Sequence, residues 1–142
     1  TLFENDRLGQ KNGKGFYLYQ KDRRGKPGKF ADDSVAELFK PLISHYHQLT
    51  DEDIVARYMV PMCIELAHCL ESGVVGSPAE ADMAMVYGLG FPAFRGGVFR
   101  WMDEMGLDNF CAMADRLGHL GKLYAPTEKM REMAASGEGY YG

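Results

Sequence analysis

Histidine is the side chain of this 142-residue sequence best suited to metal or acid–base chemistry, and two of its four histidines stand close together. His45 and His47 could chelate a metal ion from a strand, but they fall in a stretch of helical periodicity, where residues i and i+2 point apart. No HExxH motif and no third ligand accompany them. His68 has Glu65 and Glu71 nearby, as a solvated helix face also would. We therefore expect no metal site and no histidine base.

The cysteines and glycine-rich segments offer no catalytic or cofactor centre either. Cys63 and Cys69 lie on apolar helical faces, which is typical of core residues. Three cysteines without a CxxC pair predict reduced thiols in a cytosolic protein. No GxGxxG follows a strand, so the dinucleotide-binding fingerprint is absent. The Asn12–Gly15 segment fits a plain turn better than a phosphate loop, because no helix follows it. Catalysis by this chain alone is not expected.

Residues 86–97 (VYGLGFPAFRGG) are unusually dense in glycine, proline and aromatic side chains. Ordering such a segment costs chain entropy, so we expect the segment to form a defined structure or surface. One reading is a tight corner between two helices. The other is a surface that approaches a ligand or another domain, with Tyr87 and Arg95 as polar handles.

The elements that would position this segment are mostly helical, after a short irregular or β-type head. Residues 16–19 form the only convincing β run, and residues 25–28 indicate a loop. Ser34 is predicted to cap a helix that continues to Tyr46 and that Pro41 kinks or splits. The capping box Ser77–Glu80 begins another helix, which runs to about Tyr87. Further helices are expected at residues 97–105, 108–118 and 127–135, the last ending near Gly137.

The strongest helix signal begins at Thr50, which is followed by three acidic residues where the helix dipole favours negative charge. Pro61 should bend this helix and Gly73 should end it. Its apolar stripe is predicted to consist of Ile54, Tyr58, Met62, Leu66 and Cys69 or Leu70.

Charge and composition describe an ordinary globular protein with an uneven charge distribution. Hydrophobic residues make up 46% and the net charge is −4. Residues 1–29 hold eight Lys and Arg against three acidic residues, a charge of +5, so the remainder carries −9. The basic head fits a solvated loop, or a surface for phosphate or an acidic partner, and the pattern does not favour nucleic acid.

No apolar run approaches the ~20 residues of a membrane helix, and no signal peptide opens the chain. We expect a cytoplasmic protein.

An internal echo relates the two ends of the sequence. Residues 7–17 (RLGQKNGKGFY) align with residues 131–141 (REMAASGEGYY) at an offset of 124, with matches at the arginine, both glycines and both aromatic positions. The echo predicts the tail of one repeat followed by a complete second copy.

Four segments together resemble the fatty acid oxidation complex alpha subunits, a family of multifunctional β-oxidation enzymes: residues 9–17, 78–83, 86–97 and 99–103. The resemblance implies a helical domain of the 3-hydroxyacyl-CoA dehydrogenase C-terminal type. In that family an enoyl-CoA hydratase/isomerase domain and a Rossmann domain precede two tandem helical repeats. Residues 1–31 would be the tail of the first repeat and a linker, and residues 32–142 the second repeat.

The resemblance also implies a chemistry that this chain does not itself carry. The longer enzyme would oxidise a 3-hydroxyacyl-CoA with NAD, using a His–Glu pair that lies before Thr1. A functional repeat has an asparagine where this chain has Ala56, and a methyl group cannot replace the hydrogen bonds of an amide. The second repeat is therefore expected to be inactive alone, with no catalytic, cofactor or metal residue. A substrate-contacting tyrosine of the family matches Tyr87.

The expected partners follow from the same resemblance. They are an acyl-CoA substrate, the first repeat and Rossmann domain in cis, and a thiolase beta subunit. A tandem copy would supply in cis the contact through which single-domain relatives dimerise. Without that copy, exposed helix faces would favour self-association. The alternatives are a stand-alone helical interaction module and an acyl-CoA-binding domain whose basic head holds the CoA phosphates.

Overall fold

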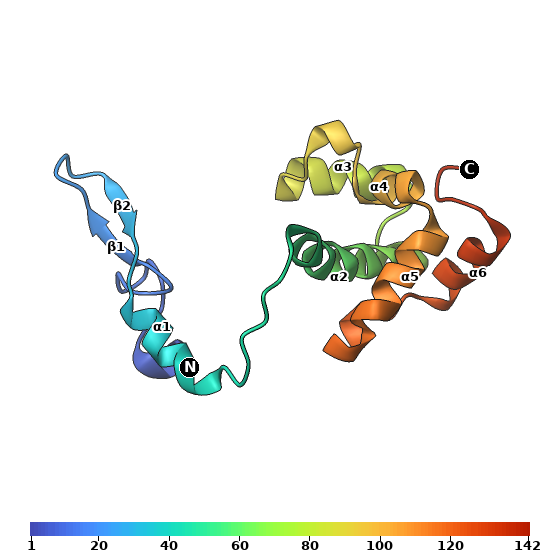
Figure 1. The fold of residues 1–142 in the computed structure, drawn as a ribbon. Coiled ribbons are helices and arrows are strands. Elements are labelled where there is room, and N and C mark those ends of the chain that lie inside the picture. Colours follow the sequence, from blue (N-terminus) through green and yellow to red (C-terminus); the bar gives the residue numbers. More distant parts are fainter. The chain divides into compact units, whose positions relative to one another are not determined.

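A β-hairpin and one short helix organise the first of the two units into which the chain divides, residues 1–48 and 49–142 (Figure 1). The computed structural model describes all residues from Thr1 to Gly142. Strands β1 (Leu18–Lys21) and β2 (Pro27–Phe30) are antiparallel, with Leu18 opposite Phe30. The turn is held by Asp22, whose carboxylate accepts the N–H groups of Arg24 and Lys26 at 2.8 and 2.9 Å.

The hairpin corrects two expectations about this head. The strand begins two residues later than the run predicted at residues 16–19, and the loop predicted at residues 25–28 is half strand. Pro27 has no N–H to donate, but at the first position of a strand this loss is tolerated. Arg7 fastens the unit, since its guanidinium donates to the Gly15 carbonyl and to Asp32, each at 2.6 Å.

The helix predicted from Ser34 to Tyr46 is much shorter in the structure. Helix α1 covers Ser34–Phe39 and passes into a single 3-10 turn, Lys40–Leu42. Pro41 splits the segment because its ring excludes the regular helical hydrogen bond. Ser34 is not the cap; Asp32 accepts both its N–H and its hydroxyl, at 3.1 and 2.7 Å. His45 and His47 consequently lie in irregular chain, not in a helix.

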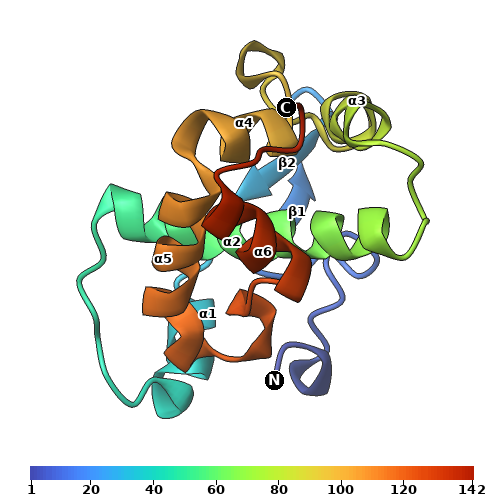
Figure 2. The same cartoon turned by 90° about the vertical axis from the view of Figure 1, so that its right-hand side faces the viewer.

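Five helices form the second unit (Figure 2): α2 (Asp51–Glu71), α3 (Pro78–Leu89), α4 (Val98–Met105), α5 (Leu107–Leu117) and α6 (Glu128–Ser136). The mostly α fold is thus confirmed. The cap at Thr50 forms as predicted, with its hydroxyl accepting the Asp53 N–H at 3.2 Å. Helix α3 continues two residues past Tyr87, because the left-handed conformation is needed only at Gly90, where φ is 72°. No helix is both long and apolar enough to cross a membrane.

Helix α2 buries a face that only partly matches the one predicted. Its fully or nearly buried residues are Met59, Val60, Cys63, Ile64 and Ala67. They pack in one core with Phe99, Met102, Phe110 and Met130 from the other helices. Ile54 and Tyr58, by contrast, are 53% and 70% exposed. The predicted stripe is therefore only partly right, since Met62, Leu66 and Leu70 pack partly buried against this core. The remainder differs because α2 is apolar on two faces and periodicity alone cannot choose between them.

Pro61 lies in the middle of α2 and leaves one backbone acceptor without its helical partner. A residue at position 61 would normally donate its N–H to the carbonyl of Arg57, four residues earlier, and proline has none. The Tyr124 hydroxyl takes that place, donating to the Arg57 carbonyl at 3.0 Å. A distant side chain thus completes the helix.

Replacing Tyr124 by phenylalanine should therefore cost about 0.5–1.5 kcal/mol of unfolding free energy, the net value of one hydrogen bond. Denaturant unfolding followed by circular dichroism measures it. In a Pro61→Ala background the new N–H can reach the Arg57 carbonyl, so the loss should shrink. Tyr46→Phe, at a side chain 88% exposed, is the control. An equal loss with and without Pro61 would contradict this account.

Candidate functional site

A buried carboxylate joins helices α3 and α4. Asp82 is only 2% exposed, yet its charge is well bonded. It accepts the N–H groups of Phe99 and Arg100, at 2.8 and 3.2 Å, in the first turn of α4. Helix α4 has no side-chain cap of its own, so Asp82 acts as the cap from another helix and meets the positive end of the α4 dipole. A Cβ at Gly97 would lie 2.2 Å from the Asp82 carboxyl carbon, so only glycine fits there.

A second carboxylate holds the C-terminal tail against the same two helices. Asp103 of α4 accepts the backbone N–H groups of Tyr140 and Tyr141, at 2.9 and 3.0 Å. The Tyr141 hydroxyl then donates to Asp82 at 2.8 Å. Burial, this hydrogen bond and the Asp82 charge raise the pKa of Tyr141 to about 12, so the hydroxyl remains a donor at neutral pH. Figure 2 shows the tail passing α4 toward α3. We call Asp82 and Asp103 the carboxylate clasp.

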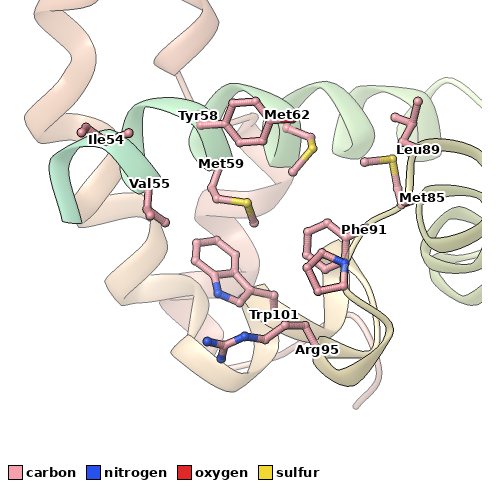
Figure 3. Close-up of a pocket in the computed structure, with 12 residues that line it drawn as sticks. Ile54, Val55, Tyr58, Met59, Met62, Met85, Leu89, Phe91, Arg95 and Trp101 are labelled. Carbon is pink, nitrogen blue, oxygen red and sulfur yellow. The ribbon is translucent and has the colours of Figure 1, made fainter. Parts of the chain in front are cut away.

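The clasp fixes the α3–α4 connection beside a groove along α2 (Figure 3). The groove has a volume of about 610 Å³, and Met59 extends from α2 toward Trp101 of α4. Arg95 is its only charged side chain. The lining residues are Ile54, Val55, Tyr58, Met59, Met62, Met85, Leu89, Gly90, Phe91, Pro92, Arg95 and Trp101.

Much of the apolar surface around this groove is open to water. Ile54, Val55 and Tyr58 are 53–70% exposed on α2, and Leu89 is 76% exposed at the end of α3. Burying each such side chain would gain about 1.5–3 kcal/mol, so a shared exposed face of this kind marks an interaction surface. We call these four residues the groove face.

Of the two polar residues predicted to contact a ligand or another domain, only Arg95 lines the groove. It also lies 4.0 Å from Glu104. Tyr87 stands in the last turn of α3, is 81% exposed and is not among the residues that line the groove. Its hydroxyl bonds to no other group of the chain, so it is free to meet one from outside. Ala56 packs partly buried against the core and offers no polar group. No group of three or more His, Cys, Asp or Glu side chains could hold a metal ion.

Sequence reasoning missed the contributions of Met59, Met62 and Trp101 to the groove. Met59 and Trp101 belong to the turns that approach each other across it, a contact between α2 and α4 that no local pattern encodes. The one available signal was the predicted apolar stripe of α2, which contains Met62 but does not indicate which of its residues face the groove.

The fold and the groove together define a small helical domain with an exposed apolar face. The family model for the 3-hydroxyacyl-CoA dehydrogenase C-terminal domain matches residues 54–139. The chain therefore belongs to the family of 3-hydroxyacyl-CoA dehydrogenase C-terminal domains, as the resemblance indicated.

Curated relatives extend the match over the whole chain. The fatty acid oxidation complex subunit alpha of Pseudomonas syringae pv. tomato is 51% identical over 142 residues, covering 100% of this chain and 20% of the relative. The protein of the same name from Ectopseudomonas oleovorans is 53% identical over 141 residues, covering 99% and 20%. The chain thus spans about a fifth of the length of these relatives.

A solved structure supports the fold alone. The crystal structure of M. tuberculosis FadB2 aligns with a TM-score of 0.56 at 23% identity, covering 78% of this chain and 43% of that one.

The two tyrosines of the tail provide a matched test of the clasp. Tyr141→Phe removes a bond to a charged acceptor and should cost about 1.5–3 kcal/mol of unfolding free energy. Tyr140→Phe should be neutral or slightly stabilising, because the Tyr140 hydroxyl is buried without a partner. Denaturant unfolding of both variants measures the difference. Equal losses would mean that ring packing, not the bond to Asp82, holds the tail.

Proposed function

We propose that this chain is a non-catalytic helical repeat of a multifunctional fatty-acid β-oxidation enzyme, and that its groove face packs against another helical repeat of that enzyme. The observation that carries the proposal is the second apolar face of α2. This helix already buries one full side in the core, yet Ile54, Val55 and Tyr58 remain exposed on another. A helix with two apolar sides needs a packing partner on each of them.

The partner in this proposal is a preceding repeat of the same polypeptide. The relatives are about five times longer than this chain, which leaves room for such a repeat. The offset-124 echo supports it, because Gly13 and Gly137 share a left-handed conformation, with φ of 81° and 75°. Phe16 and Tyr17, the counterparts of the clasped tyrosines, are 61% and 39% exposed. Residues 1–31 then form the tail of the first repeat, and 32–142 the second.

The reaction of the longer enzyme is proposed to be NAD-dependent oxidation of a 3-hydroxyacyl-CoA, and this chain does not fit the cofactor. Its only sheet is the two-stranded hairpin, whereas a dinucleotide needs a parallel sheet with a glycine-rich turn at a helix start. No step through NAD can be assigned to these residues. The longer enzyme would hold NAD in its Rossmann domain, carry enoyl-CoA hydratase activity and assemble with a thiolase beta subunit in the cytoplasm.

Tyr87 is the residue proposed to reach the acyl-CoA. It offers a ring and an unpaired hydroxyl at a position fixed by the clasp, so it can both pack against the substrate and hydrogen-bond to it.

Similarity over the whole chain to long enzymes does not favour the two alternatives, a stand-alone interaction module and an independent acyl-CoA-binding domain. Self-association of the isolated chain through the groove face stays a prediction.

The packing role can be tested by burying a charge in the groove face. Tyr58→Glu should leave the isolated chain nearly unchanged, since the side chain is 70% exposed. In the full-length enzyme it should cost about 3 kcal/mol or more, because the carboxylate would be buried unpaired. Leu123→Glu, at a side chain 69% exposed and outside the groove, is the matched control. A small effect of Tyr58→Glu in both contexts would refute the packing role.

The substrate role of Tyr87 predicts a graded effect in the full-length enzyme. Tyr87→Phe should weaken acyl-CoA binding by about 0.5–1.5 kcal/mol, the value of one hydrogen bond, and Tyr87→Ala should weaken it more. The dehydrogenase KM and the melting temperature are measured for both variants. The same assay on the isolated chain should give no turnover with NADH and a 3-ketoacyl-CoA. A loss of thermal stability at unchanged KM would make Tyr87 purely architectural.

A further inference from the structure

A second cavity of the helical unit, separate from the groove, lies between the first turns of α2 and the end of α5. Its volume is about 240 Å³. Three nitrogen-bearing side chains line it: Arg57 from α2, Arg116 from the last turn of α5, and His119 from the turn that follows. Asp53 is the only acidic residue in the lining.

These positively charged side chains lie together in a unit whose net charge is negative. Residues 49–142 contain seven Lys and Arg against fourteen Asp and Glu, a net charge of −7. Two of the five arginines of the unit nevertheless face the same small cavity. Neither Arg57 nor Arg116 forms an ion pair or stacks on an aromatic ring. The remaining three are engaged elsewhere: Arg131 with Asp115, Arg95 with Glu104, and Arg100 over the Tyr141 ring.

The acidic residue of the lining does not bind these arginines directly. Asp53 forms no ion pair with either one. Its Oδ2 instead accepts the N–H and the hydroxyl of Thr50, each at 3.1 Å, as part of the α2 cap. The two arginines outnumber this one carboxylate, so the lining keeps a net positive charge.

Two of these three side chains, Arg57 and His119, are positioned by contacts within the chain. The Arg57 Nε is buried without a partner, one of only two such side-chain atoms in the structure, so packing and not hydrogen bonding positions this side chain. His119 places Nδ1 3.0 Å from the Arg116 carbonyl. A carbonyl only accepts, so the proton of a neutral ring lies on Nδ1, and Nε2 remains available to a ligand.

We propose that this cavity binds a phosphate group, either as free orthophosphate or as part of a small phosphate ester. Guanidinium groups match phosphate oxygens with paired N–H donors, and the net positive charge of the lining favours an anion. When Nδ1 carries the ring proton, Nε2 of His119 can accept a hydrogen bond from the P–OH group of a monoanion. The site does not depend on the packing role of the groove face.

Orthophosphate titration of the whole chain tests the proposal, followed by amide NMR shifts at constant ionic strength with chloride as the replaced anion. Shifts should saturate around the start of α2 and the end of α5. Arg116→Gln and His119→Gln, both at exposed side chains, should weaken binding about ten-fold or more. Lys129→Gln removes a positive charge outside the cavity and should leave binding unchanged.

Two further probes separate the sources of the phosphate. Tighter binding of adenosine 3′,5′-bisphosphate than of orthophosphate would show that the cavity takes an ester, and the reverse order would show that it takes the free ion. Acetate at the same ionic strength should give no saturable shift. Equal phosphate binding in Arg116→Gln and the unchanged chain, or a response to acetate equal to that to phosphate, would overturn the proposal.

Discussion

Two aspartates carry the tertiary arrangement of the helical unit. A carboxylate as buried as Asp82 is costly unless its oxygens are well bonded, and here they accept two N–H groups of α4 and the hydroxyl of Tyr141. Because these donors come from α4 and from the tail, and Asp82 itself belongs to α3, the hydrogen bonds of one carboxylate hold three parts of the chain together. Gly97 and Gly139 are required by the same constraint, since a Cβ at either position would collide with one of the two carboxylates.

The sequence predicted those features that depend on neighbouring residues. The helix starts at Thr50 and Ser77 and the helix end at Gly137 follow from local chemistry, and all three are present. The family could also be identified, because its motifs are contiguous. The β-hairpin was largely missed, since its turn depends on a side chain, Asp22, that bonds across four residues.

What could not be predicted depends on contacts between distant segments. Neither aspartate of the clasp carries a sequence signal, because the partners of Asp82 lie 17, 18 and 59 residues away. The core face of α2 could be predicted only in part, for a related reason. Burial of Met59 and exposure of Tyr58 are decided by where the other helices pack, and only part of the apolar surface of α2 is covered by this chain. That uncovered part is also what makes the helix informative about function.

The position of the tail partners has a consequence for how the protein is made. Translation delivers the chain from its N-terminus, and α3 and α4 emerge well before Tyr140 and Tyr141. Until those residues leave the ribosome, Asp103 lacks both of its backbone donors and Asp82 lacks its hydroxyl. The nascent helices can be formed while their mutual arrangement is still loose, so the unit reaches its final packing only after its last few residues have been synthesised.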